Sequence, residues 1–149
     1  MIYFATDHAG FELKNTLVAY VRDELGYEVE DCGPAIYDAE DDYPDFIAIA
    51  AAKVSKSPND KAIILGGSGQ GEAIVANRFP FVRTAVFYGG DRDILKLSRE
   101  HNDANILSLG SRFLSEEDAK QSVQLWLATE FSGEERHVRR IKKIEQIQK

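Results

Sequence analysis

The sequence is poor in cysteine, methionine and tryptophan, with one of each in 149 residues. A single thiol, Cys32, cannot form an internal disulfide, which excludes a disulfide-stabilised secreted domain and is typical of a reducing cytosol. No apolar run approaches the roughly 20 residues that a membrane-spanning helix needs. The opening residues, MIYFATDHAG, have no basic residue before the apolar ones, so we expect no secretory signal and a cytoplasmic protein without a membrane partner.

Basic residues are also scarce, since 18 lysines and arginines face 25 aspartates and glutamates and leave a formal net charge of -7. Binding nucleic acid needs a basic surface, so this balance argues against a nucleic-acid partner. One local exception is the strongly basic stretch RHVRRIKK, residues 136–143. A chain of 149 residues that is 44% hydrophobic suits a single domain, residues 1–149, with a real core.

Short apolar segments alternate along the chain with segments of helical periodicity. Apolar and β-branched residues predict strands at 1–6, 27–33, 61–67, 82–87 and 104–110. Apolar spacing and capping signals predict helices at 11–26, 46–56, 72–79, 91–102, 115–131 and 134–149, with Ser115 as a helix cap. Because the strands are almost continuously apolar, we expect one α/β domain with a parallel sheet covered on both faces. The pattern does not determine the order of the strands.

Polar and glycine residues follow several predicted strands: Asp7 with His8, the loop 66–71, residues 88–90, and residues 110–112. Ligands of open parallel sheets bind at the carboxyl ends of the strands, so these groups are candidates for one site. A further group, His101 and Asn102, ends a predicted helix just before a strand, which leaves its position relative to the others open.

A glycine-rich loop, LGGSGQGE at residues 65–72, runs into a predicted helix with Glu72 at the junction. Its spacing matches neither a Walker loop nor a dinucleotide fingerprint, so a nucleotide-binding module is disfavoured. Converging backbone amides attract anions, but Glu72 would repel a permanent phosphate there. A transient oxyanion would not be repelled if Glu72 had just taken a proton, which favours a general base beside an enediolate site. The alternative is that Glu72 merely complements the helix dipole.

Proton transfer between adjacent carbons also needs an acid near the substrate hydroxyls, and His8 or His101 could supply it. Arginine binds phosphate in a bidentate manner, and the candidates are Arg112, Arg136, Arg139 and Arg140. Arg136 and Arg140 share one face of the last predicted helix, which either packs on its own domain or reaches a partner. Taken singly, each residue is equally compatible with a structural role, such as a hydrogen-bonded histidine, a helix cap or a solvated basic face.

Five segments together resemble the ribose-5-phosphate isomerase B family, which also contains galactose-6-phosphate and allose-6-phosphate isomerases: ATDHAGFELK, DDYPDF, GGSGQGEAIVANR, SREHNDANILSLGSR and RHVRRIKKIE. The match covers nearly the whole chain. It implies a Rossmann-like three-layer α/β/α sandwich with a mostly parallel five-stranded sheet and an extended C-terminal helix. It also implies an aldose–ketose isomerase that works through a cis-enediol without metal or cofactor, in homodimers that are often paired into tetramers.

The resemblance also implies roles for individual residues. Many members carry a cysteine base at the position of Gly66, whereas this chain resembles the branch with a glutamate base at Glu72. His101 would open the furanose ring with the help of Asp7, and Asn102 would contact the substrate hydroxyls or the enediolate. The remaining substrate-binding residues would be His8, Tyr43, Gly67, Ser68, Gly69, Gln70, Gly71, Arg112, Arg136 and Arg140. In this family the arginines of the last helix come from the neighbouring subunit.

The substrate expected from the resemblance is a sugar phosphate, with D-ribose 5-phosphate and D-ribulose 5-phosphate as the interconverted pair. Isomerisation of a six-carbon sugar phosphate, such as allose or galactose 6-phosphate, and a non-catalytic sugar-phosphate-binding subunit remain as alternatives. The presence of Glu72, His101 and Asp7 together with the arginines favours an enzyme. The acidic run DAEDDYPD, residues 38–45, is the one cluster that suggests a metal, and we expect a solvated loop there, with Asp42 and Tyr43 at most near the pocket mouth.

Overall fold

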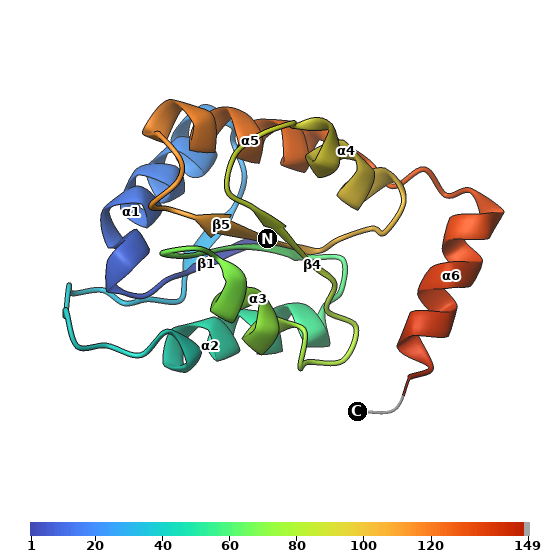
Figure 1. Ribbon diagram of the computed structural model, residues 1–149, viewed down its shortest axis with the longest axis horizontal. Helices are drawn as coiled ribbons and strands as arrows, with labels where there is room; N and C mark the ends of the chain where they lie inside the picture. The colour runs from blue at the N-terminus through green and yellow to red at the C-terminus, as the bar shows by residue number, and fades with distance from the viewer. Residues whose placement is uncertain (148–149) are drawn as a thin grey trace.

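Five parallel strands form the centre of the protein, and the computed structural model describes them within residues 1–147 (Figure 1). The strands are β1 (Ile2–Ala5), β2 (Val29–Asp31), β3 (Lys61–Gly66), β4 (Thr84–Phe87) and β5 (Ile106–Gly110). They are ordered β2-β1-β3-β5-β4, and every neighbouring pair is parallel. The prediction of a parallel sheet is therefore confirmed, and β2 and β4 are its edges.

Helices cover both faces of the sheet, which makes the three layers that the resemblance implies (Figure 1). One face carries α1 (Phe11–Ala19), α4 (Asp93–Glu100) and α5 (Glu116–Ala128), and the other carries α2 (Tyr43–Lys56) and α3 (Gln70–Ala76). A short 3-10 turn, η1 (His8–Gly10), precedes α1, and a π-helical turn, η2 (Tyr20–Glu24), follows it. Among the described residues, no helix combines the length and apolar character needed to cross a lipid bilayer.

The apolar strands supply two cores because successive side chains point to opposite faces of a sheet. Ile63 and Leu65 of β3 belong to the core under α1, α4 and α5, whereas Ala62 and Ile64 belong to the core over α2 and α3. All four side chains are fully buried. The continuous apolar runs in the sequence therefore reflect strands that are covered on both sides.

Two helices begin earlier than their sequence periodicity predicts. Helix α2 begins at Tyr43 rather than at residue 46, because Asp42 takes the extended N-cap conformation and Pro44 fits the first helical turn. Helix α3 begins at Gln70, two residues before Glu72, after Gly69 turns the chain with a φ of 78°. The predicted cap of α5 is confirmed, since the Ser115 side chain accepts a hydrogen bond from the Asp118 N–H.

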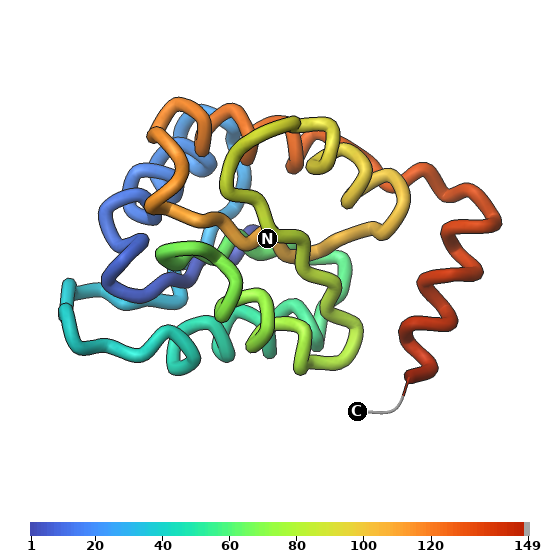
Figure 2. The backbone as a smooth tube through the Cα atoms, viewed as in Figure 1, coloured from blue at the N-terminus to red at the C-terminus, as the bar shows by residue number. Residues whose placement is uncertain are grey.

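The last helix, α6 (Glu135–Glu145), stands beside the three layers rather than within them (Figures 1 and 2). It lies beyond edge strand β4, at the side of the sheet where the strands begin. Its end is tied to the sheet by an ion pair between Arg83 Nη1 and Glu145 Oε1 at 2.6 Å. The prediction of a helix outside the strand–helix pattern is confirmed, although residues 148–149 of its predicted range lie outside the described part of the chain.

Candidate active site

The carboxyl ends of β1, β3 and β5 meet at one edge of the sheet and bring three predicted groups together. Gly66 at the end of β3 lies opposite Gly110 at the end of β5. The Ser111 N–H donates to the Gly66 carbonyl at 2.8 Å, and the Ser111 hydroxyl also donates to the Ala9 carbonyl at 3.0 Å. These bonds fix the segment after β1 and the segment after β5 on either side of the glycine loop.

Glu72 lies in the first turn of α3, and only 4% of its surface is exposed. Its carboxylate packs against the α-carbon of Gly66, where any added Cβ would overlap it. Burial raises the pKa of Glu72, the nearby Asp7 carboxylate raises it further, and a hydrogen bond from the backbone lowers it. A carboxylate with a raised pKa is suited to general-base catalysis near neutral pH.

The glycine loop lies on the end of β5, and its own glycines allow that approach. Gly69 has a φ of 78°, and the Ser108 hydroxyl donates to its carbonyl at 2.7 Å. A Cβ added to Gly110 would come within 2.8 Å of the Ser68 carbonyl oxygen. The Gln70 N–H donates to the Ser68 hydroxyl at 3.3 Å, so Ser68 shapes the turn into α3.

Two side chains from other elements cover this loop. The Arg112 guanidinium lies over Gly67, where an added Cβ would be 3.0 Å from Nη1. The Tyr43 hydroxyl lies over Gly71, 2.6 Å from the position of an added Cβ. Arg112 reaches the loop from the end of β5, and Tyr43 reaches it from the first turn of α2. A cation and a hydroxyl donor therefore flank the loop amides.

Asp41 is a site residue that the sequence analysis missed. Its Oδ1 accepts a hydrogen bond from the His8 backbone N–H at 3.0 Å and lies 2.7 Å from His8 Nδ1. The Asp41 side chain is only 7% exposed, so the acidic run 38–45 is not a uniformly solvated loop. The hydrogen bond to Asp41 raises the pKa of His8, and the negative charge of Asp7 raises it further. Desolvation and the positive charge of Arg112 lower the pKa, but the net shift is upward. Nothing in a run of five acidic residues marks the one that turns inward.

Asp7, His8 and Asp41 also form the one group among residues 1–147 whose ligand atoms lie close enough to hold a metal ion, all within 4.8 Å. Three of its atoms already have partners, whereas Asp41 Oδ2 is buried and has no hydrogen-bond partner among residues 1–147. Asp7 Oδ1 accepts from the Ala9 N–H at 2.9 Å and caps η1, while Asp41 Oδ1 holds His8. The separation of 2.7 Å between His8 Nδ1 and Asp41 Oδ1 is that of a charge-assisted hydrogen bond.

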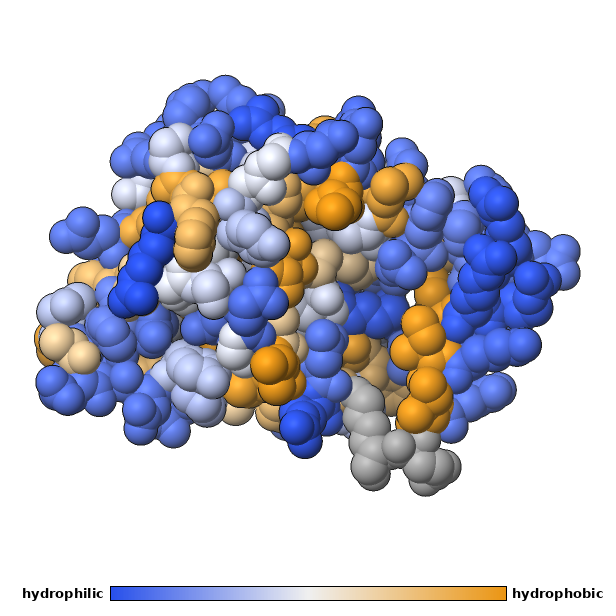
Figure 3. Space-filling model, viewed as in Figure 1, coloured by the Kyte–Doolittle hydropathy of each residue, from blue (hydrophilic) through white to orange (hydrophobic). Residues whose placement is uncertain are grey.

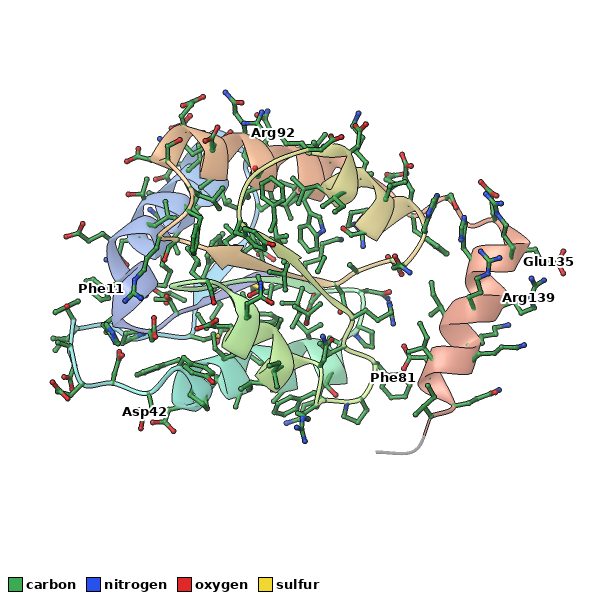
Figure 4. The ribbon with its side chains drawn as sticks, viewed as in Figure 1. Phe11, Asp42, Phe81, Arg92, Glu135 and Arg139 are labelled. Atoms are coloured by element: carbon green, nitrogen blue, oxygen red, sulfur yellow. The ribbon has the colours of Figure 1, made fainter. Side chains whose placement is uncertain are left out.

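His101 and Asn102 lie at the opposite edge of the sheet from Asp7 and Glu72. His101 is the C-cap of α4, and Asn105 just before β5 bonds to Ala62 near the beginning of β3. The length of β5 separates this edge from the glycine loop by about 16 Å. Figure 4 shows the two edges, with Phe11 and Asp42 at the edge where the strands end and Phe81 and α6 at the other. One chain therefore cannot bring its own His101 to its own Asp7.

The amino edge carries its own cluster of predicted site residues. His137 in the first turn of α6 stacks on His101 with ring centroids 4.2 Å apart. Arg136 and Arg140 flank His137 on the helix and are exposed. The Asn102 side chain is exposed beside Arg83, whose Nε donates to the Asn102 carbonyl at 2.9 Å. The predicted site is therefore divided into a base group at the carboxyl edge and a histidine–arginine group at the amino edge.

Known proteins match the chain over nearly its whole length. The family model described as Ribose/Galactose Isomerase matches residues 2–144. Ribose-5-phosphate isomerase B of Mycobacterium tuberculosis strain H37Rv is 39% identical over 140 residues, which cover 94% of this chain and 85% of the relative. The crystal structure of ribose-5-phosphate isomerase B from Mycoplasma genitalium with bound ribulose-5-phosphate has a TM-score of 0.91 at 36% identity and covers 97% of this chain and 93% of that one. The corresponding Clostridium thermocellum structure has a TM-score of 0.89 at 39% identity, covering 97% and 95%.

Proposed function

The chain belongs to the ribose/galactose isomerase family, and we propose that it interconverts D-ribose 5-phosphate and D-ribulose 5-phosphate. The observation that carries this proposal is the buried Glu72 carboxylate, which packs against Gly66 at the point where the glycine loop begins. Such an arrangement places a base with a raised pKa beside a site for a developing oxyanion. The ribulose-5-phosphate bound to the Mycoplasma genitalium relative supports the same substrate.

In the proposed reaction, Glu72 removes the proton from C2 of the open-chain aldose and returns it to C1. The electron pair left at C2 forms the C1–C2 double bond of a cis-enediolate, whose oxygen accepts hydrogen bonds from the amides of residues 67–71. Protonated Glu72 is neutral at that moment, so it does not repel the oxyanion. The same carboxyl group then delivers the proton to C1 and is ionised again, and the proton at oxygen moves between the two hydroxyls.

Ring opening precedes this step because ribose 5-phosphate is a furanose. We assign it to His101, which donates a proton to the ring oxygen while the C1 hydroxyl gives up its own proton, with Asp7 assisting. Asn102 and Tyr43 bind the sugar hydroxyls. The phosphate is held by cationic side chains at the far end of the sugar, namely His8, Arg112, Arg136 and Arg140.

These roles need two copies of the chain, since His101 and Asp7 lie at opposite edges of one sheet. We propose a homodimer in which one copy supplies Asp7, Glu72 and the loop, and the other supplies His101 with the arginines of α6. The surface beside edge strand β4 suits such an association, because Ile74 of α3 and Ile94 and Leu97 of α4 are exposed there. A two-fold axis would form two such sites at once.

The reaction itself is tested with ribose 5-phosphate in deuterated buffer containing a chelator, followed by NMR. Ribulose 5-phosphate with deuterium at C1 is the expected product, since the carboxyl proton exchanges with solvent before its return. Absence of turnover with this substrate would contradict the assignment. The same assay with allose and galactose 6-phosphates tests the second candidate, which the family description supports by naming galactose alongside ribose.

The shared site is tested by combining two inactive variants. Glu72→Gln and His101→Asn, each expected to be inactive alone, are co-expressed with different tags and purified through both tags. Each mixed dimer then holds one site with both substitutions and one with neither, so about half of the wild-type activity returns. Mixed dimers as inactive as either parent would show that both groups act within one chain.

A further inference from the structure

The ring of His137 lies flat against the ring of His101, with centroids 4.2 Å apart and planes inclined by 16°. The two residues come from different elements, since His101 ends α4 and His137 lies in the first turn of α6. His137 is only 4% exposed, although it lies in a helix whose other described residues are mostly exposed. Its Nε2 is buried and has no hydrogen-bond partner among residues 1–147.

The surroundings of His137 favour its neutral form. Burial lowers the pKa of His137, and the electrostatic effects of His101, Arg136 and Arg140 lower it further. The negative charge of Glu134 raises the pKa, but the net shift is downward. A neutral His137 ring adds no charge beside His101, and the stacked contact fixes the plane of the His101 ring.

From this geometry we infer that His137 is a positioning residue for ring opening, which holds the His101 imidazole in the orientation that delivers its proton to the ring oxygen. The inference rests on the proposed isomerase function and adds a role for a residue to which the sequence analysis gave none. His137 does not touch substrate in this scheme, because its ring is covered by His101 and the body of the protein.

A purely structural role for the stack would act through α6. The helix is held at its other end by the Arg83–Glu145 ion pair. A groove of about 440 Å³ separates the sheet from Ile144 of α6 and from Ile147, which follows the helix. Figure 3 shows apolar side chains on the side of α6 that faces the body, with hydrophilic ones on the outer side. If the stack only anchored α6, its loss would displace Arg136 and Arg140 and weaken phosphate binding, which would raise KM. If the stack positions His101, its loss would instead lower kcat.

The test compares His137→Leu, which removes the aromatic face, with His137→Phe, which keeps a face of similar size. Three quantities are measured for each: kcat and KM for ribose 5-phosphate, and the inhibition constant of D-ribonate 5-phosphate, an open-chain acid with no ring to open. Glu145→Gln serves as the comparison variant, because it loosens the other end of α6 and leaves the stack intact. Thermal melting confirms that each variant is folded.

We expect His137→Leu to lower kcat about ten- to a hundredfold, the loss that a misplacement of about 1 Å causes, with KM and the inhibition constant nearly unchanged. His137→Phe should recover most of kcat, and Glu145→Gln should raise KM and the inhibition constant together. An unchanged kcat in His137→Leu, or a loss of ribonate 5-phosphate binding that accompanies the fall in kcat, would overturn the inference. Wild-type activity is measured first. A wild-type protein that does not turn over ribose 5-phosphate would refute the proposed function itself, and this outcome is distinct from any effect of the variants.

Discussion

The carboxylate of Glu72 occupies the space that a side chain on Gly66 would fill. The two residues are six positions apart in the sequence, but the turn through Gly69 folds the start of α3 back over the end of β3. In the many relatives expected to carry a cysteine base at the position of Gly66, the thiol would lie in this same space. In this packing a side chain at position 66 and the Glu72 carboxylate cannot share that space, so the proposed glutamate base and a cysteine at position 66 would exclude each other.

Gly66→Ala should remove most of the activity without unfolding the protein. The added Cβ displaces the Glu72 carboxylate, and overpacking of a filled site lowers the free energy of unfolding by about 1–3 kcal/mol. We expect kcat to fall at least about a hundredfold, since the base loses its position. Gly67→Ala is the matched control, because the atoms nearest to its Cβ belong to the flexible end of Arg112, so it should mainly raise KM. Equal kinetic effects of the two substitutions would argue against the placement of the base.

Glu72→Gln should abolish isomerisation, with a loss of about 10²–10⁴ in kcat, and should also stabilise the protein at neutral pH. The raised pKa of Glu72 means that its contribution to stability is fully present below its unfolded pKa and is lost as the pH rises through the folded pKa. Above its folded pKa the wild-type protein therefore holds a buried anion that glutamine avoids. We expect a gain of about 1 kcal/mol at pH 7, a melting temperature higher by about 2–4 °C, and no gain near pH 4.

The same pKa predicts the acidic side of the pH–rate profile of the wild-type enzyme. The base must be ionised, so kcat/KM should fall as the pH drops through a value above the 4.5 of an ordinary glutamate. A profile that stays flat down to pH 4.5, or a Glu72→Gln variant with wild-type turnover, would rule out Glu72 as the base.

Asp41→Asn should weaken binding of the sugar phosphate most strongly at alkaline pH. The carboxylate raises the pKa of His8, so its removal lets His8 lose its positive charge at a lower pH. We expect KM to rise about tenfold at pH 8 and much less at pH 6, with kcat changed little. Asp42→Asn is the control, since Asp42 is exposed and its side chain makes no capping hydrogen bond. A rise in KM that does not depend on pH would show that Asp41 acts on loop structure alone.

Thiol reagents should leave the enzyme active. Burial raises the pKa of Cys32 to about 11, and the neighbouring Glu30 adds to this, so the thiolate that such reagents attack is scarce at pH 7.5. Incubation with iodoacetamide should alkylate Cys32 only slowly in the folded protein, and Cys32→Ser should retain activity within about twofold of the wild type. Inactivation in step with alkylation of Cys32, measured by mass spectrometry, would contradict this prediction.

The parallel sheet could be predicted from the sequence because its strands are buried on both faces, and runs such as AIIL leave no other arrangement for their side chains. The meeting of Asp7, the glycine loop and Arg112 also followed from the rule that parallel strands end at one edge. The apolar periodicity of α2 begins only at residue 46, because the residues before it are mostly acidic, and Pro44 is the one local signal for the start at Tyr43. The order of the strands depends on long-range contacts that no local pattern records.

The inward turn of Asp41 and the stacking of His137 could not be predicted for a related reason. Each depends on a partner from a distant part of the chain, His8 for Asp41 and His101 for His137. Burial of these side chains is decided by the fold as a whole, whereas their sequence neighbours are exposed acidic and basic residues. A polar residue within a charged run carries no local sign that it will be enclosed.

The five residues of β5 have a second consequence, beyond the core that they fill. One end of the strand supports the loop beside Glu72, and the other end lies near His101. In the proposed dimer, β5 would therefore set the distance between the two groups that one copy contributes to two different sites. Insertion or deletion of a residue there would change that spacing by about 3.3 Å and would also reverse the faces of the side chains. In the proposed dimer, the length of this buried strand must therefore suit both the packing of the core and the distance between the two active sites.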